Sequence, residues 1–72
     1  MIGRMVYDAA ADRWCVDMGE SDLYELHCGD ALEARISGAW SSVRMECDGV
    51  GWYLTDSGGQ ILRGLLGLEV ET

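Results

Sequence analysis

The chain has 72 residues, of which 49% are apolar and 25% charged, and five arginines against thirteen acidic residues give a net charge of −8. This composition excludes a disordered chain, and the length is too short for two hydrophobic cores, so we expect one domain over residues 1–72. The charge argues against direct binding of DNA or RNA, which requires a clustered basic face, because the arginines are spread along the sequence.

The lengths of the apolar runs and the number of cysteines bear on the cellular location of the protein. No apolar run approaches the roughly 20 residues that span a bilayer, and the first seven residues are too short a run for a signal peptide. The cysteines, Cys15, Cys28 and Cys47, are odd in number, whereas secreted mini-domains usually carry even sets that form disulfides. We therefore expect a cytoplasmic protein with no membrane association and with reduced, mostly buried thiols.

Short strands joined by tight turns are the pattern of the whole chain. Clusters of glycine, aspartate and serine, among them GESD at 19–22, recur at about the 8–12-residue spacing of all-β proteins. The first cluster, DAAAD at 8–12, fits a hairpin loop or a short helical turn. After it the residues alternate, with Trp14, Val16 and Met18 on one face of a strand.

The heptad YELHCGD, residues 24–30, contains the only histidine of the chain. Read as a strand, it places Tyr24, Leu26 and Cys28 in the core and leaves Glu25 and His27 on the opposite face. The strand then ends at a glycine turn, where the carboxylate of Asp30 is expected to accept backbone N–H bonds.

Residues 30–37 fit either a strand or a short helix. Leu32, Ala34 and Ile36 alternate as in a strand, but alanine, leucine, glutamate and arginine all favour helix. The sequence leaves this choice open.

The second half of the chain repeats the strand pattern. Alternation places Val43, Met45 and Cys47 on an inward face, and residues 51–62, GWYLTDSGGQIL, predict a hairpin with its turn at DSGG. The last expected strand carries Leu66, Leu68 and Val70 on one face and Glu69 and Glu71 on the other, where we expect a solvated surface.

Five to seven short strands are too few for a large two-sheet sandwich, and a flat open sheet would expose an apolar face and two edges. We therefore predict an all-β fold, either a small SH3-like barrel or a strongly curled antiparallel meander. The first and last strands should lie near one another.

The order of the segments YELHCGD, SGAW, GWYL and a glycine turn resembles a family of short bacterial proteins, domain of unknown function 5348, over most of residues 3–70. The resemblance implies a small β-barrel-like fold, often encoded among the genes of mobile elements. It brings no established catalytic residue.

His27 and Cys28 are the candidates for a metal or catalytic site. Structural zinc sites usually supply paired ligands with short spacings, and the chain has no such pair. In a strand the two side chains point to opposite faces, which also separates a cysteine nucleophile from a histidine base. We therefore predict no enzymatic activity, no metal and no cofactor.

Aromatic side chains give the strongest functional signal. Trp14 and Trp52 are expected in the core, whereas Trp40 follows a turn and Tyr53 lies on the outer face; tryptophan and tyrosine are enriched where proteins bind partners. The structural alternative is that Trp40 covers an open barrel end. We predict an interaction surface of Trp40, Tyr53 and His27, on a non-enzymatic module that binds a protein partner or itself through these aromatics or a strand edge.

The acidic surface supports an alternative function. An inhibitor encoded by a mobile element can imitate nucleic acid with carboxylates and occupy the basic groove of another protein. The simpler explanation is that the net charge keeps a small apolar domain soluble, because the carboxylates form no run.

Overall fold

Eight antiparallel strands form one sheet in the computed structural model, which describes residues 1–19 and 21–72. The strands are β1 (Ile2–Asp8), β2 (Arg13–Asp17), β3 (Tyr24–Glu25), β4 (Ala31–Ile36), β5 (Ala39–Cys47), β6 (Trp52–Asp56), β7 (Ile61–Leu62) and β8 (Glu69–Glu71). Their order across the sheet is β3-β2-β1-β8-β4-β5-β6-β7. The described residues include no helix, and so none that is long and apolar enough to cross a membrane.

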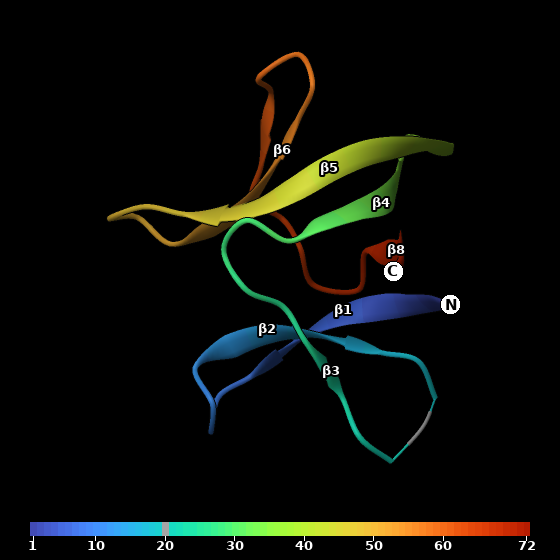
Figure 1. The fold of residues 1–72 in the computed structure, drawn as a ribbon, viewed down its shortest axis with the longest axis vertical. Helices are drawn as coiled ribbons and strands as arrows, with labels where there is room; N and C mark the ends of the chain where they lie inside the picture. The colour runs from blue at the N-terminus through green and yellow to red at the C-terminus, as the bar shows by residue number, and fades with distance from the viewer. Residues whose placement is uncertain (20) are drawn as a thin grey trace.

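The last strand joins the two halves of the sheet. β8 lies between β1 and β4, pairing Val70 with Gly3 on one side and with Ala34 on the other. Figure 1 shows β8 between a half made of β1, β2 and β3 and a half made of β4, β5 and β6. The expectation that the first and last strands are neighbours is therefore confirmed.

A loop links the two halves on the side opposite β8. The backbone N–H of Leu26 donates to the carbonyl of Trp14 in β2 over 2.9 Å. Three residues later the N–H of Gly29 donates to the carbonyl of Met45 in β5 over 2.7 Å, and the N–H of Met45 donates to the carbonyl of Asp30 over 2.8 Å. The chain thus crosses from β2 to β5 within residues 26–30.

The predicted curled antiparallel meander is confirmed. The sheet stays open, with β3 and β7 as its edges. It has eight strands rather than the five to seven expected, because three of them are very short, with only two or three residues. A curled sheet with such short edges exposes little unpaired backbone.

Alternating side chains fill the inner face of the curl. The buried cluster comprises Met5, Val16, Leu26, Leu32, Ala34, Val43, Met45, Leu54, Leu65 and Val70. Trp14, Met18, Ile36, Trp52, Leu62 and Leu68 pack around this cluster and are partly buried. The faces predicted from alternation in residues 13–18 and 31–36 are therefore correct.

Within the ambiguous segment, residues 30–37, the structure has a strand, β4, and no helix. β4 pairs with β5 along its whole length and with β8 at Glu33 and Ala34. Pairing on both sides satisfies the backbone in extended form, and this tertiary context outweighs the helix propensity of the residues.

The YELHCGD heptad departs from its prediction except at Leu26, which is buried as expected. The strand ends at Glu25, Tyr24 is 48% exposed, and Cys28 is also exposed. β3 has a neighbour on one side only, and the chain then turns toward β5, so alternation does not continue beyond it. The predicted role of Asp30 is confirmed, because its Oδ2 accepts the backbone N–H of His27 over 2.8 Å.

Two further expectations about burial are wrong. Only Cys15 of the three thiols is buried, because Cys47 is the last residue of β5, where the core ends. The final strand begins at Glu69, and a turn closed by the N–H of Leu68 and the carbonyl of Leu65 buries Leu65 and leaves Leu66 exposed. Glu20, in the GESD cluster, lies outside the described residues.

The β6–β7 hairpin forms as predicted. The Oδ1 atom of Asp56 accepts the backbone N–H groups of Gly58 over 2.9 Å and Gln60 over 3.0 Å. Gly59 follows with a φ of 81°, a conformation that glycine adopts without a steric penalty. This hairpin forms one end of the sheet.

Candidate binding site at the free edge of strand β7

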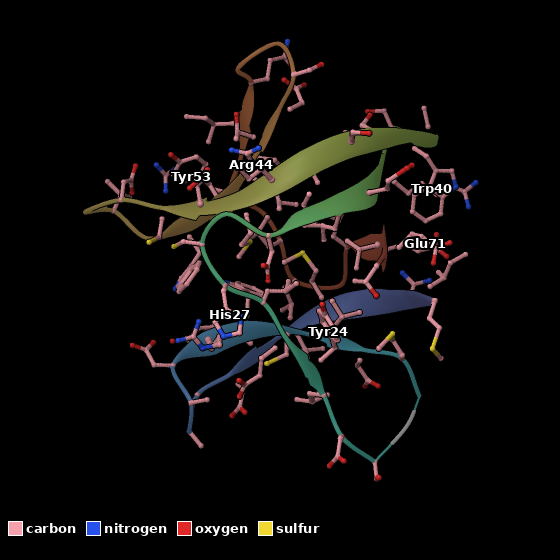
Figure 2. The ribbon with its side chains drawn as sticks, in the orientation of Figure 1. Tyr24, His27, Trp40, Arg44, Tyr53 and Glu71 are labelled. Atoms are coloured by element: carbon pink, nitrogen blue, oxygen red, sulfur yellow. The ribbon has the colours of Figure 1, made fainter. Side chains whose placement is uncertain are left out.

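Trp40 and Tyr53 share the outer face of the sheet, the face opposite the core, but not one patch. Tyr53 pairs across strands with Glu46, which lies six residues after Trp40 on β5. At a rise of about 3.3 Å per residue, this spacing separates the two positions by about 20 Å. Figure 2 shows Trp40 and Tyr53 toward opposite ends of β5.

One face of the Tyr53 ring is covered by the chain itself. The guanidinium of Arg63 lies 4.9 Å from the ring centroid, a cation–π contact, and its Nη2 lies 2.7 Å from Oδ2 of Asp48. The hydrogen bond from Arg63, with those from the backbone of Val50 and Gly51, lowers the pKa of Asp48 to about 2. These contacts leave less of Tyr53 available to a partner than its outward position suggested.

His27 lies in the loop between β3 and β4, on the Tyr53 side of the molecule (Figure 2). Its side chain is 59% exposed, and its Nδ1 lies 3.7 Å from Oδ2 of Asp30. Within residues 1–19 and 21–72, no three side chains of histidine, cysteine, aspartate or glutamate converge as metal ligands.

A pocket of about 260 Å³, which we call the β7 pocket, opens between β7 and the β4–β5 hairpin. It is lined by Ile36, Ser41, Val43, Leu54, Asp56, Gln60, Ile61 and Leu62. Pockets for drug-sized molecules usually measure about 300–1,000 Å³, so this one is closer in size to a socket for a single apolar side chain.

The backbone beside this pocket has unpaired hydrogen-bonding groups. β7 is an edge strand, and next to it the N–H of Asp56 donates to the carbonyl of Gln60 over 3.1 Å. In an antiparallel pair, hydrogen-bonded and non-hydrogen-bonded residue pairs alternate along the strands. Gln60 and Leu62 therefore direct their backbone groups toward β6, and the N–H and C=O of Ile61 point away from β6. The side chain of Ile61 is 57% exposed. An extended peptide can therefore form backbone hydrogen bonds with Ile61 and place one apolar side chain in the β7 pocket.

Sequence reasoning named a strand edge in general but did not locate it at β7. The available signal was the DSGG hairpin, whose second strand is followed by RGLLG, residues 63–67, rather than by a further alternating strand. The pocket itself gave no signal, because Ile36 and Ser41 come from a hairpin distant in sequence from β7.

Comparisons with known proteins cover the whole sheet. The family described as Domain of unknown function (DUF5348) matches residues 3–71. A crystal structure of a protein from Ruminococcus gnavus matches with a TM-score of 0.82 and 30% sequence identity, over 100% of both chains. No protein with a curated description matches the chain. The two folds thus correspond over the full length of both chains.

Proposed function

The chain belongs to the family Domain of unknown function (DUF5348), and from this membership and the β7 site we propose that it is a non-enzymatic protein-binding module. Its β7 edge pairs with an extended segment of a protein partner, and one apolar side chain of that segment enters the β7 pocket. The observation that carries the proposal is the position of the pocket directly beside the outward backbone groups of Ile61.

The partner segment is expected to be basic as well as apolar. Addition of a strand to a sheet edge takes affinity from backbone hydrogen bonds and specificity from pockets for alternate side chains. Asp56 lines the β7 pocket, and the chain carries a net charge of −8. Lysine or arginine next to the inserted apolar side chain therefore complements this surface.

Selection of peptides tests the proposal. A displayed library of random dodecapeptides, selected on the wild-type protein, should yield sequences in which apolar residues alternate with lysine or arginine. Ile61→Pro removes the outward N–H, and Ser41→Leu fills the pocket from β5. Both variants should weaken binding of the selected peptides at least tenfold.

Ser42→Leu is the matched control, because Ser42 neighbours Ser41 on β5 but faces the opposite side of the sheet. It should bind the selected peptides like the wild type. Peptides that bind both β7-site variants normally and lose binding in Ser42→Leu or Trp40→Ala would instead place the interaction on the outer face with Trp40.

The surface predicted from Trp40, Tyr53 and His27 remains a competing contact within the same functional class. Of the two aromatic residues, Trp40 is the better candidate for contacting a partner, because it is exposed and the Tyr53 ring already contacts Arg63. Self-association is a further form of the proposal, in which β7 pairs with β7 of a second copy. Sedimentation would then give a dimer that Ile61→Pro converts to monomer.

An acidic inhibitor or nucleic-acid mimic encoded by a mobile element is the second candidate. One observation favours it: Glu33 and Glu71 lie opposite each other across β4 and β8. A like-charged cross-strand pair costs stability, which among the described residues only the N-terminal ammonium of Met1 beside Glu71 offsets, so a binding role would explain why both carboxylates are present. Binding by a mimic falls steeply as salt rises, whereas binding at the β7 edge changes little. Retention of binding after Glu33→Gln, Glu46→Gln and Asp48→Asn would reject the mimic.

We also propose that the protein acts in the cytoplasm and that its curled sheet is of the SH3-like type. The cytoplasmic location is supported by the three free cysteines, because secreted domains of this size usually carry an even number of cysteines joined in disulfides. The SH3-like type is supported by the short strands and the strong curl of the sheet.

A further inference from the structure

Cys28 and Cys47 form a close pair on the surface. Their Sγ atoms lie 2.7 Å apart, both residues are exposed, and both thiols are free. A disulfide bond measures about 2.05 Å, so a small approach of the two sulfur atoms brings them to bonding distance.

Backbone hydrogen bonds hold the pair together. Cys28 precedes Gly29, whose N–H donates to the carbonyl of Met45, and the N–H of Met45 donates in turn to the carbonyl of Asp30. Cys47 follows two residues after Met45, at the end of β5, where it pairs with Trp52. The contact therefore depends on the main chain at both ends rather than on chance side-chain positions.

We propose that Cys28 and Cys47 are a redox modification site that forms a reversible intramolecular disulfide on reaction with a hydroperoxide. This proposal is independent of binding at β7. Reversible disulfides in cytoplasmic proteins are usually catalytic or redox-sensing, and two exposed thiols in contact have the arrangement of an attacking and a resolving cysteine.

The chemistry balances with hydrogen peroxide as the oxidant. The thiolate of one cysteine attacks the peroxide, the O–O bond breaks, and sulfenic acid and hydroxide form. The second thiol then attacks the sulfenic sulfur, the S–S bond forms, and water leaves. Two thiols and one peroxide thus give one disulfide and two waters, and a dithiol reductant restores both thiols.

The contact between the two thiols changes the acidity of Cys28. The hydrogen bond to Cys47 raises the pKa of Cys28, and desolvation and the charge of Glu46 act in the same direction. The Cys28 thiol therefore holds its proton more strongly than an isolated cysteine does. Either thiol of the pair can be oxidised first, and the other then resolves the sulfenic acid.

The disulfide would close the curled sheet covalently. β8 joins the two halves on one side, and on the other side the chain itself crosses between them at residues 26–30, held to β2 and β5 by hydrogen bonds. A bond from Cys28 to Cys47 adds a covalent link between this crossing loop and the end of β5, closing a loop of about 20 residues. Closing such a loop restricts the conformations of the unfolded chain, and this is expected to lower the unfolding equilibrium constant about 200-fold.

Peptide mapping tests the site. The full chain is treated with hydrogen peroxide, blocked with N-ethylmaleimide and digested with trypsin, which cuts after Arg35 and Arg44 and so separates Cys28 from Cys47. We expect a monomeric chain whose two fragments are joined by a disulfide that dithiothreitol releases. The oxidised chain should also unfold at a higher urea concentration than the reduced chain.

Three variants complete the test. Cys28→Ser and Cys47→Ser should each abolish the link, and the thiol that remains in each variant should accumulate a sulfenic acid that dimedone traps. Cys15→Ala is the control that should keep the link, since Cys15 is buried. Disulfides between chains, overoxidation to sulfinic acid without a link, or an oxidised chain less stable than the reduced one would each overturn the proposal.

Discussion

Gly3 provides a sharp test of the packing of the sheet. It lies in β1 opposite Val70 of β8, and a Cβ atom placed on it would lie 2.6 Å from the carbonyl oxygen of Asp17 and 2.6 Å from Cγ1 of Val16. A third contact, 2.8 Å from Cγ of Met18, involves a flexible side chain that can move. The backbone oxygen cannot move without shifting β2 away from β1.

Gly3→Ala should therefore be clearly destabilising. Adding a methyl group to a packed site costs about 1–3 kcal/mol, and the rigid carbonyl favours a loss of about 2 kcal/mol. For a domain of this size such a loss lowers Tm by roughly 8–16 °C. Thermal unfolding followed by far-ultraviolet circular dichroism measures the shift.

Gly49→Ala is the matched control for this substitution. A Cβ atom on Gly49 meets nothing within 4 Å, and its φ is not in the left-handed region, so its stability should change by less than about 0.5 kcal/mol. Equal melting temperatures for the two variants would refute the close approach of β1 and β2 at Gly3.

Two further predictions concern ionisable groups. The lowered pKa of Asp48 means that its pairing with Arg63 stabilises the fold above its ordinary pKa of 3.8 and that this contribution is lost as the pH falls through about 2. The Tm difference between wild type and Asp48→Asn should therefore be largest near neutral pH and vanish near pH 2; a constant difference contradicts the ion pair. Burial raises the pKa of Cys15, so N-ethylmaleimide should label the reduced native chain at Cys28 and Cys47 and reach Cys15 only after unfolding, as peptide mass spectrometry can show.

Alternation predicted the strands well where they have two neighbours. Leu32 and Ala34 in β4 and Val43 and Met45 in β5 are buried as expected, because pairing on both sides keeps the backbone extended. Alternation failed at Cys28, beyond the end of the short edge strand β3, where backbone bonds to another strand set the direction of the chain. Local pattern does not contain that information.

The β7 pocket and the cysteine pair both depend on contacts between distant segments. Val70 of β8 inserts between β1 and β4, and this pairing fixes which strands remain at the edges. Cys28 and Cys47 meet because the loop at Gly29 bonds to β5. Neither arrangement follows from periodicity, although the hairpin before β7 and the number of cysteines were visible in the sequence.

Amide hydrogen exchange at Ile61 tests the central functional claim most directly. The outward N–H of Ile61 should exchange rapidly in the free protein and become protected when a library-selected peptide binds, because it then donates to the peptide backbone. Protection at least tenfold greater than in the free chain is the predicted result. Unchanged exchange at Ile61, together with new protection beside Trp40 on β5, would contradict the proposed β7 site.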